Sequence, residues 1–115
     1  MTASIEHGRL YAADLGSRQG TEPGKLRPVL VIQTDLLNGA RHPSTWVVPC
    51  TTKLAGESLL RVYLPRGIAG NVADCELMID QSRAIDNRRV KRRLGTLPRR
   101  LLAEVKEKLR LLADL

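Results

Sequence analysis

The sequence predicts a small, mainly β domain that forms a partly open barrel and ends in a C-terminal helix. Its 115 residues fit one compact domain (residues 1–115) that can bury a hydrophobic core of its own. Short apolar stretches recur along most of the chain, and glycine or proline separates each from the next. In the last segment the apolar residues fall at helical spacing instead.

The first two strands are expected at residues 8–15 and 27–34. The second contains the continuous apolar run PVLVI, which is typical of a strand that is buried on both faces. Pro28 is expected at its beginning, where a missing N–H disturbs the sheet least. The polar residues 16–25, which include three glycines and a proline, are expected to form a mobile loop between these strands.

Three more strands are expected at residues 45–51, 59–64 and 74–80, with residues 35–44 as an irregular connection. The helix is expected after Pro98, because proline suits the first turn of a helix. Its apolar stripe is expected to pack on the barrel and consists of Leu101, Val105, Leu109 and Leu112. Glu104 and Lys108 are spaced for an ion pair on this helix.

The positive charge of the chain is concentrated in one stretch. The formal net charge is +7, and residues 83–100 hold eight basic residues against the single acid Asp86. Such a stretch favours a polyanionic partner, nucleic acid above all, although a solvated face that serves solubility explains the composition equally well. No apolar run approaches the ~20 residues that cross a bilayer, and the first residues are polar and acidic. We therefore expect a cytoplasmic protein without a membrane partner.

Polar residues at strand ends are the best candidates for a functional site. Arg27 begins the strongest strand, Thr51 ends another, and Asp80, Gln81 and Arg83 follow the fifth. No metal-ligand motif, phosphate-binding loop or nucleophile elbow is present in the sequence, so no metal is expected.

Histidine and cysteine offer alternative chemistry. His7 and His42 lie in expected terminal and loop segments and could act as a general base, although an exposed histidine usually has no such role. Cys50 and Cys75 match no metal-ligand spacing and are expected to be reduced core thiols.

Several motifs together resemble the MazF/PemK toxin family in order and spacing, over nearly the whole chain. They are GRLYAADL (8–15), GKLRPVLVIQ (24–33), Thr51-Thr52, DQSRAID (80–86) and LGTL (94–97). The resemblance implies an SH3-like barrel that forms a homodimer. It also implies a toxin that cuts single-stranded RNA within a short preferred sequence, without metal or cofactor, to 2′,3′-cyclic phosphate and 5′-hydroxyl ends. The implied partner is an acidic antitoxin of the MazE type.

The resemblance also implies roles for single residues. Arg27 and Thr51 match the catalytic pair of the family, and Gln81 matches a residue that contacts RNA. Asp80 and Glu22 match acidic positions, and either could be the acid or base. Arg83 matches the family pattern as a structural or an RNA-contacting residue.

Specificity is expected from the loops 17–25 and 53–59. Lys25, Thr52 and Lys53, in or next to these loops, are further candidates for RNA contact. Base stacking would come from Tyr11, Trp46 or Tyr63, but all three lie in expected strands, where core packing is the more usual role. Two other functions fit the same barrel. One is a CcdB-like toxin that binds DNA gyrase and cuts nothing, and the other is an RNA-binding module without toxicity.

Overall fold

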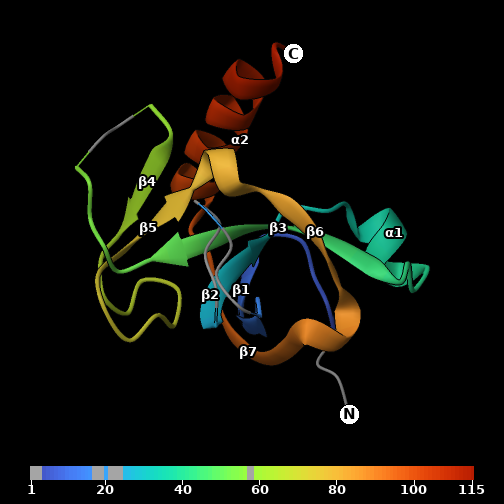
Figure 1. Ribbon diagram of the computed structural model, residues 1–115. Helices are drawn as coiled ribbons and strands as arrows, with labels where there is room; N and C mark the ends of the chain where they lie inside the picture. The colour runs from blue at the N-terminus through green and yellow to red at the C-terminus, as the bar shows by residue number, and fades with distance from the viewer. Residues whose placement is uncertain (1–3, 17–19, 21–24, 57–58) are drawn as a thin grey trace.

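The computed structural model describes residues 4–16, 20, 25–56 and 59–115. In this part of the chain, seven antiparallel strands precede a long C-terminal helix, α2 (Figure 1). The strands are β1 (Arg9–Asp14), β2 (Leu26–Val31), β3 (Ser44–Thr51), β4 (Arg61–Leu64), β5 (Cys75–Met78), β6 (Arg83–Asp86) and β7 (Val90–Thr96). The helices are α1 (Asp35–Gly39), η1 (Ile79–Gln81), η2 (Asn87–Arg89) and α2 (Arg99–Ala113).

The strands form one sheet that branches at β3. Its order is β4-β5-β3-β2-β1-β7, and β6 also pairs with β3. β3 carries β2 on one edge, and on the other edge β5 pairs with its last residues while β6 pairs with its first. The expected mainly β fold with a C-terminal helix is confirmed. Among the described strands, β4 and β7 lie at the two ends of this order and do not pair with each other, so the sheet is curved but open.

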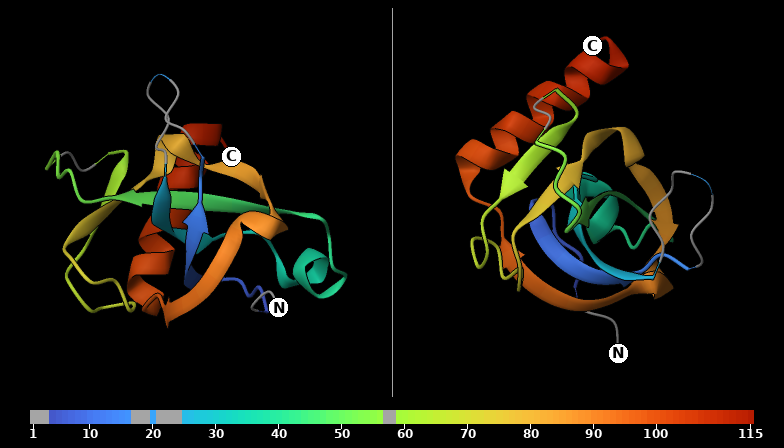
Figure 2. Two further views of the ribbon diagram at one scale, coloured as in Figure 1. Left: turned by 60° about the horizontal axis from the view of Figure 1, so that its bottom comes forward. Right: turned by 60° about the vertical axis from the view of Figure 1, so that its left-hand side comes forward.

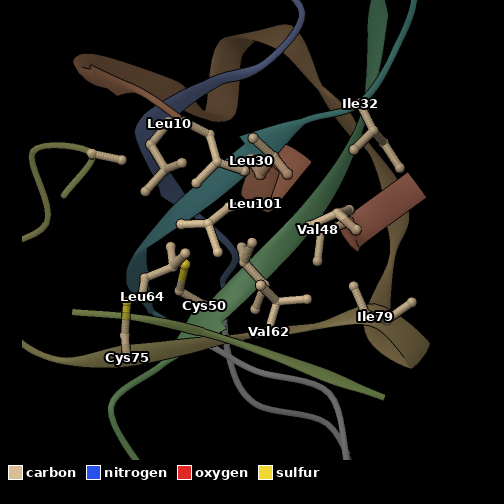
Figure 3. Close-up of a cluster of buried hydrophobic side chains, with 14 residues drawn as sticks. Leu10, Leu30, Ile32, Val48, Cys50, Val62, Leu64, Cys75, Ile79 and Leu101 are labelled. Atoms are coloured by element: carbon tan, nitrogen blue, oxygen red, sulfur yellow. The ribbon is translucent and has the colours of Figure 1, made fainter. Parts of the chain in front are cut away.

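The expectation that the second strand is buried on both faces is confirmed. Leu30 of β2 belongs to a core beneath α2 that also contains Val48 and Leu101 (Figure 3). Val29 and Val31 point to the opposite face, into a second core with Tyr11. β2 is therefore the shared wall of two hydrophobic cores, and its last three residues are fixed from both sides.

Helix α2 follows the expected pattern over its first three turns. Leu101 and Val105 are buried, and Leu109 packs against the same core. Leu112 was expected to pack as well, and this was wrong, because its side chain is 49% exposed. The end of α2 projects beyond the strands, as Figure 2 shows, so no strand lies beneath its last turn. Glu104 and Lys108 form the expected ion pair, with 3.0 Å between Nζ and Oε2.

Three other details differ from expectation. Residues 35–44 include the short helix α1, which begins where the Thr34 hydroxyl accepts a hydrogen bond from the Leu36 N–H. The charged strand β7 was not expected, and it pairs with β1 through two register shifts. Its composition suits an edge strand, where charge discourages further pairing. Trp46 and Tyr63 are 45% and 48% exposed, so only Tyr11 has the expected core position.

No helix in the described residues is both long and apolar enough to cross a membrane.

Candidate functional site

A cavity of about 260 Å³ opens where β2 begins and β3 ends. It brings together four of the residues expected in the site: Arg27, Thr51, Lys25 and Thr52. The remaining lining residues come from the ends of the same strands and from the loop before β5: Leu26, Pro28, Cys50, Asn71, Val72, Ala73 and Cys75.

The beginning of β2 and the end of β3 bring Arg27 and Thr51 to one cavity. Val29 of β2 pairs with Pro49 of β3, and this is the last β2–β3 pair before Arg27 and Thr51. Beyond this pair the cavity opens, and both Arg27 and Thr51 line it. Arg27 is half-buried, and its Nη1 donates a hydrogen bond of 3.4 Å to the carbonyl oxygen of Cys50. Two residues that are 24 positions apart in the sequence thus present a cation and a hydroxyl to one cavity.

Thr51 is held in place by the turn that follows it. Its side chain is largely buried, and its Oγ1 accepts a hydrogen bond of 3.1 Å from the backbone N–H of Lys53. A hydroxyl that accepts one hydrogen bond still has a proton to donate. This geometry makes Thr51 suited to donate to an oxygen atom in the cavity.

The wall formed by residues 69–73 is organised by Asn71, which the sequence did not single out. Its Nδ2 donates to the carbonyl oxygens of Pro65 and Ala73 at 3.0 and 2.9 Å, and its Oδ1 accepts from the Ala69 N–H at 3.1 Å. Asn71 is only 3% exposed, so these bonds satisfy its buried amide. They fix the loop that forms one side of the cavity.

A second missed residue, Glu76, lies across β3 from the cavity. It is paired with Thr51 in the β3–β5 register and is only 4% exposed. Burial raises the pKa of this carboxyl, but hydrogen bonds from Ala55, Gly56 and Arg61 outweigh burial, so the net pKa is lowered. A glutamate inside the otherwise apolar strand CELM was the sequence signal for it, because a buried charge requires partners.

The two cysteines are free and buried, as expected. A hydrogen bond from one thiol to the other, together with burial, raises the pKa of Cys50 well above its usual value. Figure 3 shows both residues at one end of the core beneath α2. The Cys50 thiol therefore stays protonated near neutral pH.

The other expected site residues lie outside the lining of this cavity. Asp80 is exposed and Gln81 half-buried on η1, which packs beside β3, and Arg83 lies opposite Val47. Lys53 is exposed one residue beyond the lining. Glu22 and most of the loop 16–25 lie outside the described residues.

The basic stretch 83–100 is only partly available to a polyanion. Arg88 binds Asp86, and the hydrogen bonds from the Arg88 side chain and backbone lower the pKa of Asp86 to about 2. Arg93 forms an ion pair with Glu6. The remaining exposed cations of the stretch are Lys91, Arg92, Arg99 and Arg100.

The histidines lie away from the cavity. His7 contacts the carbonyl oxygen of Ile32 through Nδ1, and His42 contacts the carbonyl oxygen of its neighbour Ser44. Within the described ranges, no three His, Cys, Asp or Glu side chains gather as they would around a metal ion.

Comparisons with known proteins agree on one family. Residues 6–113 match the model of the PemK-like, MazF-like toxins of type II toxin–antitoxin systems. Endoribonuclease MazF2 of Mycobacterium bovis is 31% identical over 112 residues, covering 96% of this chain and 98% of that protein. The crystal structure of MazF from Deinococcus radiodurans superposes with a TM-score of 0.84 at 27% identity, over 98% of this chain and 99% of that one.

A second solved structure, of MazE–MazF from Deinococcus radiodurans, matches at a TM-score of 0.79 and 30% identity, over 98% of both chains. The fold agrees with these solved structures over nearly the whole chain. The chain belongs to the PemK-like, MazF-like family of toxins of type II toxin–antitoxin systems.

Proposed function

We propose that this toxin is an endoribonuclease that cleaves single-stranded RNA without a metal ion, with Arg27 and Thr51 as its catalytic residues. The observation that carries the proposal is the shared cavity, which Arg27 and Thr51 line together. The endoribonuclease relatives, which match almost the full length of the chain, support this activity.

RNA supplies the nucleophile for its own cleavage. The 2′-oxygen attacks the adjacent phosphorus, the bond from phosphorus to the 5′-oxygen breaks, and a 2′,3′-cyclic phosphate and a 5′-hydroxyl result. The proton of the 2′-hydroxyl passes to a base, and the leaving 5′-oxygen receives a proton. The enzyme therefore has to align the attack and stabilise the charge that develops on the phosphorane.

Arg27 is suited to the developing negative charge. A guanidinium carries five N–H donors in a planar fork, so an arginine held by a backbone carbonyl can also bind two phosphate oxygens. It remains charged at any relevant pH, which makes it a poor general base. Arg27 stabilises the negative charge on the phosphorane and, late in the reaction, donates a proton to the leaving 5′-oxygen.

Thr51 donates its hydroxyl proton to a non-bridging phosphate oxygen. The hydrogen bond that its oxygen accepts from Lys53 N–H fixes the orientation of the hydroxyl before RNA arrives. Donors fixed in this way cost no reorganisation during the reaction.

The general base is an acidic residue, with Asp80 and Glu22 as the two candidates. Asp80 is exposed on η1, close in sequence to Gln81 and Arg83. Lys25 and Thr52 at the cavity, together with Lys53, Gln81 and Arg83, contact the RNA on either side of the cut.

The partner that restrains this activity is an acidic antitoxin of the MazE type, which covers the basic surface and the cavity. The MazE–MazF structure, similar over 98% of this chain, supports this pairing. The active form is a homodimer in the cytoplasm, as the family resemblance implies.

The test is to incubate the purified toxin with a long RNA in EDTA and to map the new ends. Cleavage at a recurring short motif, with cyclic phosphate ends, is expected from the wild type and is absent from Arg27→Ala prepared in the same way. Gyrase inhibition without cleavage, or RNA binding without cleavage, would contradict the proposal and favour one of the two non-nuclease functions.

A further inference from the structure

The buried carboxylate of Glu76 ties one short segment to the sheet. Its Oε1 accepts hydrogen bonds from the Ala55 N–H at 2.9 Å and from Arg61 Nη1 at 2.9 Å. Its Oε2 accepts from the Gly56 N–H at 3.2 Å. Both backbone donors belong to the segment that follows Thr51, and Arg61 is the first residue of β4, after that segment.

The position of Glu76 links these hydrogen bonds, which together we call the Glu76 clamp, to the cavity that Arg27 and Thr51 line. Glu76 lies opposite Thr51 in the β3–β5 register, and the Thr51 hydroxyl is in turn held by the Lys53 N–H. The Glu76 carboxylate therefore lies beside Thr51, accepts hydrogen bonds from Ala55 and Gly56, and pairs with Arg61 at the start of β4. Release of Ala55 and Gly56 would loosen the turn that orients Thr51.

Stability alone does not account for a charge at this position. Glu76 is the only charged residue of the buried strand CELM, and its neighbours Cys75, Leu77 and Met78 belong to the buried core. An ion pair of this kind is often matched or exceeded in stability by apolar side chains of similar size. Apolar side chains would leave the N–H groups of Ala55 and Gly56 without their carboxylate acceptor, so the clamp fixes the backbone there.

We propose that Glu76 and Arg61 are positioning residues, which hold the segment 52–56 so that Thr51 meets the scissile phosphate in a productive orientation. This inference rests on the proposed function. Because misplacement of a reacting group by about 1 Å can cost on the order of 100-fold in rate, loss of the clamp acts on kcat. The affinity for RNA changes less than kcat, because Lys25, Gln81 and Arg83 hold the RNA from outside this segment.

The experiment compares Glu76→Gln with Glu104→Gln. Glu104 lines a second cavity together with Glu76 and Arg61, but its carboxylate is more exposed and binds Lys108, so it serves as a control carboxylate outside the clamp. We expect Glu76→Gln to lower kcat by about 10- to 100-fold with KM within about threefold. Glu104→Gln should retain the wild-type kcat.

A double variant, Arg61→Leu with Glu76→Leu, separates positioning from folding. We expect it to melt close to the wild type and still to show the low kcat. Hydrogen exchange gives a second readout, since the amides of Ala55 and Gly56 should exchange faster while those of β3 remain protected. Should the double variant not fold, the same two readouts are taken on Arg61→Gln, whose side chain is 23% exposed.

Wild-type kcat in a folded variant whose Ala55 and Gly56 amides exchange faster would overturn the positioning role. Unchanged exchange of these amides in Glu76→Gln would overturn the clamp itself. If the wild type cuts no RNA, the proposed function fails, and the exchange measurement still decides whether the clamp exists.

Discussion

Replacing Gly95 of β7 with alanine tests whether the wall of the cavity depends on close backbone packing. A Cβ at Gly95 would lie 2.5 Å from the carbonyl carbon of Ala69, 2.6 Å from its oxygen and 3.0 Å from the nitrogen of Gly70. These are backbone atoms, which cannot swing aside as a flexible side chain would. The loop 69–73 must therefore shift, and with it Asn71, Val72 and Ala73 on the cavity wall.

The magnitude follows from the cost of overpacking, about 1–3 kcal/mol of unfolding free energy. At ~4 °C for each kcal/mol in a domain of this size, the melting temperature falls by about 4–12 °C. A displaced wall also disturbs the cavity, so we expect cleavage to fall by about tenfold at a temperature where the variant is fully folded.

The assay is thermal unfolding by circular dichroism, followed by RNA cleavage well below the transition. Gly39→Ala is the control, because a Cβ at Gly39 in α1 would meet nothing within 4 Å. That control should change stability by less than about 1 kcal/mol, in the stabilising direction. A Gly95→Ala variant with wild-type stability and activity, or a Gly39→Ala variant equally damaged, would refute this reasoning.

Three further predictions concern acid stability, the core and the basic surface. The lowered pKa of Glu76 contributes stability that is complete above about pH 4.5 and is lost as the pH falls through its folded-state pKa. The difference in urea midpoint between wild type and Glu76→Gln should therefore shrink towards pH 3, and a difference independent of pH would contradict this. Leu30→Ala should cost about 2–5 kcal/mol in urea unfolding, whereas Leu36→Ala, at a side chain 84% exposed, should stay near wild type; similar losses in both would contradict the core assignment. In a catalytically inactive background, replacing Lys91 and Arg92 with serine should reduce the salt slope of RNA binding by about 1.4, from ~0.7 for each lost phosphate contact. An unchanged salt slope would show that Lys91 and Arg92 of β7 do not contact the RNA phosphates.

The elements whose apolar residues follow a regular pattern could be predicted from the sequence. The PVLVI run predicted a strand buried on both faces, and Leu101 and Val105 predicted the inner face of α2. Strand β7 was missed because only Val90 of its seven residues is fully buried, so no apolar alternation marks it. It pairs with β1 through backbone hydrogen bonds, and these do not require any pattern of apolar and polar side chains.

The site was predictable residue by residue, but its geometry was not. Strand ends and motif resemblance singled out Arg27 and Thr51, whereas their register depends on how β2 and β3 pair. Exposure of Trp46 and Tyr63 was missed because an aromatic residue in a strand does not reveal whether its own face is covered. Glu76 was visible as a charge in an apolar strand, but its partners lie 15 to 21 residues earlier in the chain.

A double-mutant cycle on Arg27 and Thr51 tests most directly whether both residues serve one phosphodiester. Arg27→Ala and Thr51→Val, the latter chosen to keep the branched shape of threonine in the strand, should each lower the cleavage rate by about 100- to 1000-fold. Because residues that act as a unit lose their effects together, the double variant should be within about tenfold of the slower single variant. The account would be contradicted if the rate loss of the double variant equalled the product of the two single losses. It would also be contradicted if a folded single variant cut RNA at the wild-type rate.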